Sequence, residues 1–224
     1  MLKKLLLLTT CSLLIVACAQ SPTGRRQIML FNDTELGKMG AQTFETMKAE
    51  TPISIVASGG KFANPDDAAE TPDTLTTIFQ FKDFNLQWEH ATGINGGPYN
   101  RDHGVAFIGN NGTLVLNRQG WEVIPERDKG KDKIERVELQ KPADEGLLKH
   151  TSNFLDVVQS RKFEDLNAPI TTGAHIAQIC QMGNIAYKLG KKIYWDAEKN
   201  KFTDSEANKH LAAEYHNGYK LPSA

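Results

Sequence analysis

The spacing of apolar residues changes along this chain, and that change limits the folds open to it. Between residues 74 and 139 apolar residues recur with period two, as in Phe84, Leu86 and Trp88, which alternate with polar residues. Between residues 144 and 189 they recur at helical spacing. Strands with one polar face, followed by helices, are typical of α+β domains. The pattern therefore predicts an open antiparallel sheet covered by helices on one face.

The strands of this sheet are expected to be short and joined by turns. Leu75, Phe79 and Phe81 share one face of a strand, and Asn110-Asn111-Gly112 is a hairpin turn because Asn-Gly tolerates positive φ. Lys129 to Lys133 is expected to be a charged, solvated loop. The predicted strands cover residues 53–57, 74–81, 84–89, 105–108, 113–116, 121–124 and 134–139.

Three helices follow the predicted strands. The first, over 144–161, carries an apolar stripe, and the second, over 173–189, ends at Gly190. A capping box at 203–206 starts a short third helix that runs to about Tyr215. Cys180 lies on the apolar pattern of the second helix, which predicts a buried, inert thiol. Core or interface positions are expected for Trp88, Trp121 and Trp195. The first stripe comprises Leu147, Leu148, Phe154, Leu155 and Val158.

The first 17 residues have the layout of a secretory signal peptide. Two lysines at positions 3 and 4 precede an apolar run that is too short for a comfortable membrane span. Ile15 to Cys18 resembles a bacterial lipobox, in which the cysteine is acylated and begins the mature protein. By resemblance to bacterial lipoproteins, Ala19 favours the outer membrane, on its periplasmic side in a Gram-negative host. The alternative is a plain signal peptide or an uncleaved anchor, with Cys18 incidental.

Residues 18–54 are expected to form a polar tether and a separate helix. Asn32 to Glu35 has the pattern of a capping box, and Thr51-Pro52 stops the helix that follows near Glu50. Thr-Gly-Arg-Arg-Gln at 23–27 and this helix resemble the start of lipoprotein zinc metallopeptidases. That family binds zinc through His-Glu-x-x-His, and the chain contains no such motif. Zinc peptidase activity is therefore not expected.

Residues 55–224 resemble a different family, the bacterial type of Gfo/Idh/MocA oxidoreductases, over its C-terminal domain. Val-Ala-Ser-Gly-Gly-Lys-Phe at 56–62 and Leu-Gln-Trp-Glu-His at 86–90 belong to the matching stretches. The others lie at 70–74, 104–109, 112–114, 171–175, 183–190, 192–196 and 206–208. The resemblance implies an open antiparallel sheet flanked by helices. It also implies a domain that shapes a substrate pocket and often forms the oligomer interface.

The family's cofactor is NAD(P), held by an N-terminal Rossmann domain with a Gly-x-Gly-x-x-Gly turn. No such turn occurs in the 224 residues, and Gly59-Gly60-Lys61 lacks the other residues of a phosphate loop. The catalytic lysine of the family's Glu-Lys-Pro motif is also absent, and Lys141-Pro142 follows Gln140 instead. We therefore expect no cofactor bound by this chain alone, no catalytic residue assigned within it and no activity on its own.

Polar side chains beside the glycine-rich stretch at 93–100 are the candidates for contact with a ligand. His90, Arg101 and His103 flank this stretch and could hydrogen-bond the hydroxyls of a sugar-like small molecule. His175, at the start of the second helix, is a further candidate, and no residues have metal-ligand spacing. The structural alternative is a loop of solvated side chains. The net charge of −1 gives no electrostatic reason to expect a nucleic acid partner.

Three interpretations of the whole chain remain open. The first is an exported, lipid-anchored remnant of a Gfo/Idh/MocA-like oxidoreductase, reduced to residues 55–224. The second is a non-catalytic binding module in the cell envelope that forms homo-oligomers through the exposed sheet face. The third is a chimeric gene product, in which a peptidase-like start is joined to an oxidoreductase-like end and has no independent function.

Overall fold

The computed structural model describes residues 19–20, 26–27, 45, 47–142, 146–212 and 217–220. Cys18, the capping box at 32–35 and most of the predicted tether helix lie outside these residues. Residues 47–49 are helical and residue 50 is not, so the expected end of that helix is confirmed. Two described segments nearer the N-terminus, β1 (Ala19–Gln20) and β2 (Arg26–Gln27), pair as antiparallel strands.

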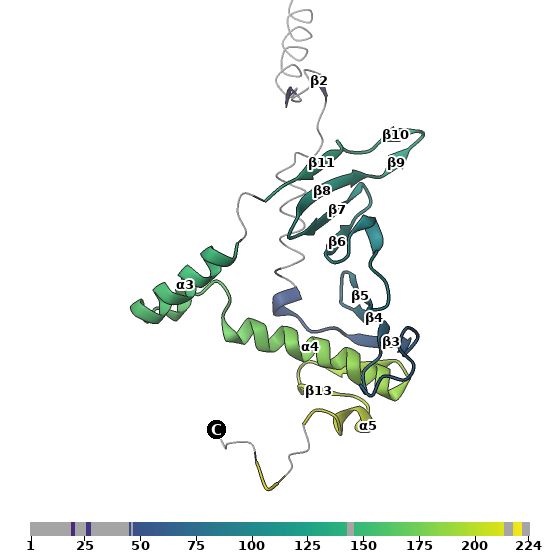
Figure 1. Ribbon diagram of the computed structural model, residues 1–224, viewed down its shortest axis with the longest axis vertical. Helices are drawn as coiled ribbons and strands as arrows, with labels where there is room; N and C mark the ends of the chain where they lie inside the picture. The colour runs from purple at the N-terminus through teal and green to yellow at the C-terminus, as the bar shows by residue number, and fades with distance from the viewer. Residues whose placement is uncertain are drawn as a thin grey trace, which may run out of the picture.

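The larger of two main antiparallel sheets has the strand order β13-β12-β3-β4-β5 (Figure 1). Its strands are β3 (Ser54–Gly60), β4 (Thr74–Gln80), β5 (Asn85–Ala91), β12 (Ile193–Asp196) and β13 (Lys201–Phe202). The periodicity at 74–89 predicted the β4–β5 hairpin, and the structure confirms it. The last two strands were not predicted from periodicity, because four and two residues are too few to show an alternation.

The smaller sheet has the order β11-β8-β7-β6 and lies above the larger one in Figure 1. Its strands are β6 (Val105–Ile108), β7 (Gly112–Asn117), β8 (Gly120–Pro125) and β11 (Val137–Gln140). The expected loop at 129–133 is wrong in part, because β9 (Arg127–Asp128) and β10 (Lys131–Asp132) pair as a short hairpin. The α+β class with antiparallel sheets is confirmed, and the described strands divide between two main sheets where the pattern suggested one.

Helix α4 (Ile170–Leu189) covers the larger sheet over β3 and β4. Gly183 lets it approach closely, since a Cβ atom there would lie 3.0 Å from the Phe79 ring and 3.3 Å from the Thr77 methyl group. Gly190 ends the helix in the left-handed region at φ 61°, as predicted, and its amide donates to the carbonyls of Ala186 and Tyr187. The helix thereby places its middle turns against the centre of the sheet.

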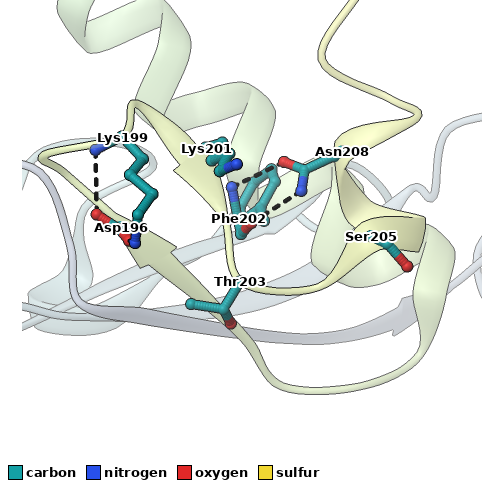
Figure 2. A pocket seen from close by; sticks show the side chains of 7 residues that line it. All are labelled: Asp196, Lys199, Lys201, Phe202, Thr203, Ser205 and Asn208. Atoms are coloured by element: carbon teal, nitrogen blue, oxygen red, sulfur yellow. Dashed lines mark hydrogen bonds and ion pairs between the residues drawn. The ribbon is translucent and has the colours of Figure 1, made fainter.

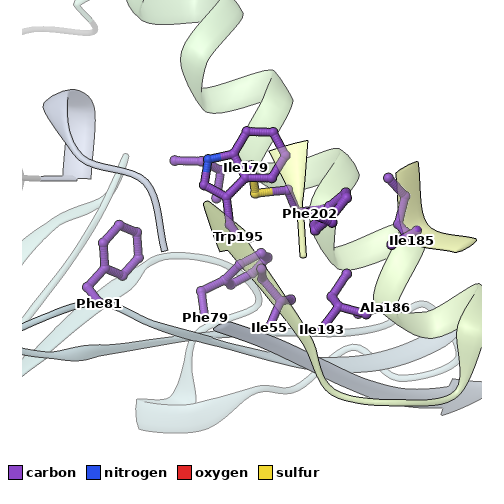
Figure 3. Close-up of a cluster of buried hydrophobic side chains, with 11 residues drawn as sticks. Ile55, Phe79, Phe81, Ile179, Ile185, Ala186, Ile193, Trp195 and Phe202 are labelled. Carbon is purple, nitrogen blue, oxygen red and sulfur yellow. The ribbon is translucent and has the colours of Figure 1, made fainter. Parts of the chain in front are cut away.

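The main hydrophobic core lies between this helix and the sheet (Figure 3). Ile55, Phe79 and Ile193 come from neighbouring strands, and Met182 and Ala186 face them from α4. On β12 and β13, the Trp195 and Phe202 rings meet edge to face with centroids 4.9 Å apart. Such a pair adds about 0.5–1.5 kcal/mol beyond the burial of its area.

The predicted burial of Cys180 is wrong. The thiol is exposed, because α4 buries the face that carries Ile179, Met182, Gly183 and Ala186, and Cys180 lies just off that face. The helical period is right, and the apolar face is rotated from the one that the sequence suggested. Cysteine is small enough to occupy a helix surface without a large cost in exposed apolar area.

The first predicted helix forms as α3 (Leu147–Ser160), but its apolar stripe is not buried. The five side chains of the stripe are between 40% and 79% exposed. Helix α3 projects away from both sheets in Figure 1 and packs against the 3₁₀ turn η2 (Phe163–Asp165) through another face, where Val157 is buried. The expectation that this helix covers the sheet is therefore wrong for the described chain.

Two further expectations need correction. Trp195 is buried, but Trp88 and Trp121 are 53% and 40% exposed, so a core position is wrong for both. Trp88 stands on the edge strand β5, beyond the part of the sheet that α4 covers. The third helix, α5, spans only Ser205–Asn208, because residues 209–212 form turns and bends where the helix was expected to continue.

None of the described helices is both long and apolar enough to cross a bilayer.

Candidate functional site

His90 lies on β5, and both of its ring nitrogens have partners. The indole N–H of Trp88 donates to His90 Nδ1 over 3.0 Å. A ring nitrogen that accepts carries no proton, so the proton of the neutral ring is on Nε2, which donates to the Pro72 carbonyl at 3.3 Å. In this geometry His90 ties β5 to the loop before β4, and neither nitrogen is left over for a ligand.

Next to Pro72, Asp73 organises the loop between β3 and β4. Its carboxylate accepts the backbone amides of Phe62, Ala63 and Asn64 at 2.8–3.0 Å, and the Thr74 hydroxyl at 2.8 Å. These bonds favour the ionised carboxylate, with the Asn64 amide as the largest cause, and they lower the pKa of Asp73. The Asp73 carbonyl also accepts the Thr92 amide at 2.9 Å. Asp73 therefore fixes the loop at 61–73 against the end of β5.

Arg101 is buried at the start of the smaller sheet. One terminal nitrogen donates to Asn117 Oδ1 at 2.7 Å, and the other lies 2.6 Å from Glu122 Oε1. Its Nε is buried and has no partner. A bidentate grip of this kind fixes geometry. Arg101 thus fastens the glycine-rich loop to β7 and β8, and two of its nitrogens are already used.

The segment just before and after Arg101 is more open. Tyr99 and Asn100 have φ near +58° and +57°, which is uncommon for residues other than glycine and costs roughly 1–2 kcal/mol for each. His103 is exposed and pairs with Asp102 at 2.7 Å through Nδ1, which leaves Nε2 facing solvent. Asn117 joins the two predicted residues, because its oxygen accepts from Arg101 and its amide donates to the His103 carbonyl.

His175 lies elsewhere, one and a half turns into α4. Its Nε2 is 3.0 Å from the carbonyl of Glu50, at the point where the chain enters the larger sheet. The contact joins residues 125 apart in sequence. The structure therefore brings Arg101 and His103 together, places His90 on another sheet and puts His175 on the helix. Their contact with a ligand stays a prediction.

A depression that the sequence did not suggest lies between β12, β13 and α5 (Figure 2). It has a volume of about 410 Å³, and none of the four predicted residues lines it. Asp196 is paired with Lys199 at 2.6 Å, and Asn208 exchanges two 2.8 Å hydrogen bonds with the backbone of Phe202. Because these polar groups are satisfied by one another, the depression is explained by the hairpin and its cap. It lacks the convergent free groups of a ligand site.

Within the part of the chain that the structure describes, no three His, Cys, Asp or Glu residues are grouped so that they could hold a metal ion. The depression was missed because β12 and β13 were missed. The Asp196–Lys199 turn and the Asp204 cap, whose side chain accepts the Glu206 amide at 2.8 Å, were the local signals for it. The Asp73 cage was also missed, since its donors are backbone amides that any sequence carries.

No protein family model and no curated protein matches the chain. A putative oxidoreductase from Klebsiella pneumoniae of known structure aligns with 74% of this chain and 49% of its own, with 10% identity and a TM-score of 0.48. The putative oxidoreductase yvaA from Bacillus subtilis aligns with 72% of this chain and 52% of its own, with 10% identity and a TM-score of 0.50. The chain thus shares its fold with about half the length of these solved structures.

Proposed function

We propose that residues 55–224 are the substrate-shaping and oligomer-forming C-terminal domain of a Gfo/Idh/MocA-type oxidoreductase. The observation that carries this proposal is the alignment of the α+β unit with about half of the yvaA structure. The ordered sequence stretches from Val56 to Asn208 support the same family. Hydride transfer needs a cofactor held against the substrate, so we propose that this chain does not perform it alone.

The described residues do not fit NAD(P). A dinucleotide pyrophosphate sits where a strand passes through a glycine-rich turn into a helix N-terminus. Helix α4 begins after Pro169 and follows a 3₁₀ turn, and α3 begins after a left-handed Gly146 that no strand directly precedes. Helix α5 follows β13 but has only four residues and no glycine before it. Nicotinamide chemistry would therefore have to be supplied by another domain or subunit.

The ligand side of the proposal rests on the loop around Arg101. Nε2 of His103 is open to solvent, Asp102 holds the ring through Nδ1, and the Tyr99 ring is 40% exposed. An aromatic face beside hydrogen-bonding groups suits a sugar-like small molecule. In this arrangement His90 and Arg101 position the loop, and His103 is the residue that contacts the ligand.

A second candidate function, an assembly module, is favoured by the uncovered face of the larger sheet. Val56 and Ile78 are cross-strand partners on the face opposite α4, and Tyr194 lies on the same face, opposite Ser54 in the register. All three are 38–48% exposed. We infer that this outer face is where copies of the domain associate.

Anchoring through lipid on Cys18, in the cell envelope, completes the proposal. Acyl chains anchor by burying CH2 groups, at about 0.8 kcal/mol each. The lipobox-like stretch at 15–18 supports this part. A chimeric origin of the chain would leave the anchor and the domain functionally unrelated.

A nicotinamide titration tests the central claim. The purified full-length chain in mild detergent is titrated with NADH and NADPH while the cofactor fluorescence is followed. We expect no saturable binding up to roughly 1 mM, a dissociation constant that corresponds to about −4.1 kcal/mol. Saturable binding in the micromolar range would show that the chain holds the cofactor by itself, and the proposal would then be wrong.

A further inference from the structure

Helix α3 exposes more apolar surface than a helix of a finished domain normally does. Leu147, Leu148, Phe154, Leu155 and Val158 lie on one face, and each is at least 40% exposed. Scattered apolar residues are common on protein surfaces, but a continuous stripe of five marks a surface that binds something. The helix stands clear of both sheets in Figure 1, so this face has no cover within the described chain.

The connection between α3 and α4 fixes the direction in which α3 points. The Asn153 side chain donates to the Asp165 carbonyl at 2.8 Å and accepts the Asn167 amide at 2.9 Å. Val157 is buried beside them, and the Arg161 amide closes the helix on the Val157 carbonyl at 2.8 Å. Helix α3 and residues 163–167 therefore form one unit. Folding α3 back over its own sheet would break both Asn153 hydrogen bonds.

The larger sheet has a matching uncovered strip on its helix side. Leu86 pairs with Phe79 and Trp88 pairs with the buried Thr77, so both side chains share the face that α4 covers. Helix α4 lies over β3 and β4, and the strip on β5 beyond it is open, with Trp88 53% exposed. The hydroxyl of Thr77, beside Trp88, is buried without a partner. The chain thus carries both a helix without a sheet and a sheet edge without a helix.

We propose that α3 of one copy packs its apolar stripe on the β5 strip of a second copy, in a reciprocal two-fold exchange. The Asn153 unit favours exchange over closure within one chain, because it holds α3 outward. Exchange of an identical element between two copies is a low-cost route to a dimer.

The area required supports a reciprocal arrangement. Stable interfaces bury about 1,200–2,000 Å² in total and use about 20–30 residues on each side. One five-residue stripe on one strip falls short of this, and two-fold exchange forms the contact twice. The surface is separate from the outer sheet face proposed above, which lies on the other side of the sheet.

Disulfide trapping between two differently tagged full-length chains tests the exchange. Both chains carry Cys180→Ser, and one carries Leu155→Cys while the other carries Trp88→Cys. Both positions are exposed, so neither substitution removes a core contact. After co-expression and mild oxidation, we expect a disulfide-linked heterodimer that carries both tags on non-reducing gels. A partner chain with Ile108→Cys, whose side chain is 74% exposed on β6, is the matched control and should give at least tenfold less product.

Three results would overturn the proposal. A single chain with both cysteines that gives only an internally linked monomer shows that α3 closes on its own sheet. A dominant homodimer of the Leu155→Cys chain shows that two stripes pair with each other. No specific product in any combination shows that the stripe binds something else, such as a lipid surface.

Two further variants separate this contact from the other interface. Asn153→Ala should release α3, so that the doubly substituted chain gains internal disulfide at the expense of the heterodimer. An unchanged ratio would contradict the positioning role of Asn153. Ile78→Lys, on the outer face, should leave the heterodimer yield unchanged even if it removes a second association. A loss with Ile78→Lys would place the copies on the outer face instead.

Discussion

At the scale of single residues, the carboxylate of Asp73 controls the order of the loop at 61–73. Asp73→Asn should weaken the three amide contacts and speed hydrogen exchange at Phe62, Ala63 and Asn64. The pKa of Asp73 is lowered in the folded state, so its stabilisation is complete above the unfolded pKa of about 3.9 and is lost as pH falls through the folded value. Exchange and melting temperature measured from pH 2 to 7 check this.

The control for Asp73 is Asp66→Asn, at an exposed carboxylate of the same loop, which should change neither quantity. Equal protection of the three amides in Asp73→Asn and the unsubstituted chain would contradict the role given to Asp73. Sequence could single out His90, Arg101 and His103 by their residue types. It could not show that Arg101 is committed to Asn117 and Glu122, because those partners follow 16 and 21 residues later and meet it only through strand pairing.

At the scale of elements, two glycines of α4 have opposite roles. Gly183→Leu should destabilise the fold by about 1–3 kcal/mol, because the new side chain enters the contact with Phe79 and Thr77. Gly173→Leu meets nothing within 4 Å and should stabilise by up to about 1 kcal/mol through helix propensity. Urea unfolding of both variants measures the difference. A neutral Gly183→Leu would mean that α4 is free to shift on the sheet.

Periodicity predicted the existence of α3, α4 and most strands, because alternation and helical spacing are local signals. It could not tell what each apolar face touches. The stripe of α3 has the spacing of a core helix and is exposed, and Cys180 lies one step outside the buried face of α4. Strand β12 was missed, although it pairs with β3 and supplies Ile193 and Trp195 to the core. Such long-range pairing leaves no mark in a four-residue segment.

At the scale of the whole molecule, the two main sheets differ in how they are stabilised. The main core joins β3, β4, β12, β13, α4 and α5, and includes no residue of the smaller sheet. The smaller sheet buries Val115, Val123 and Thr113. Its glycine-rich loop is held through Arg101. A small sheet with little apolar burial is marginal by itself, so it should open at a lower free energy than the larger one.

Native-state hydrogen exchange should therefore show amides of β7 and β8 opening before those of β3 and β4. Val123→Ala should lower protection in the smaller sheet alone. Ile55→Ala should cost about 2–5 kcal/mol and lower protection throughout, because its side chain is completely buried in the main core. If both variants lowered the protection of all strands equally, the sheets would unfold as one unit. Arg101 and its partners would then couple them more strongly than their separate cores imply.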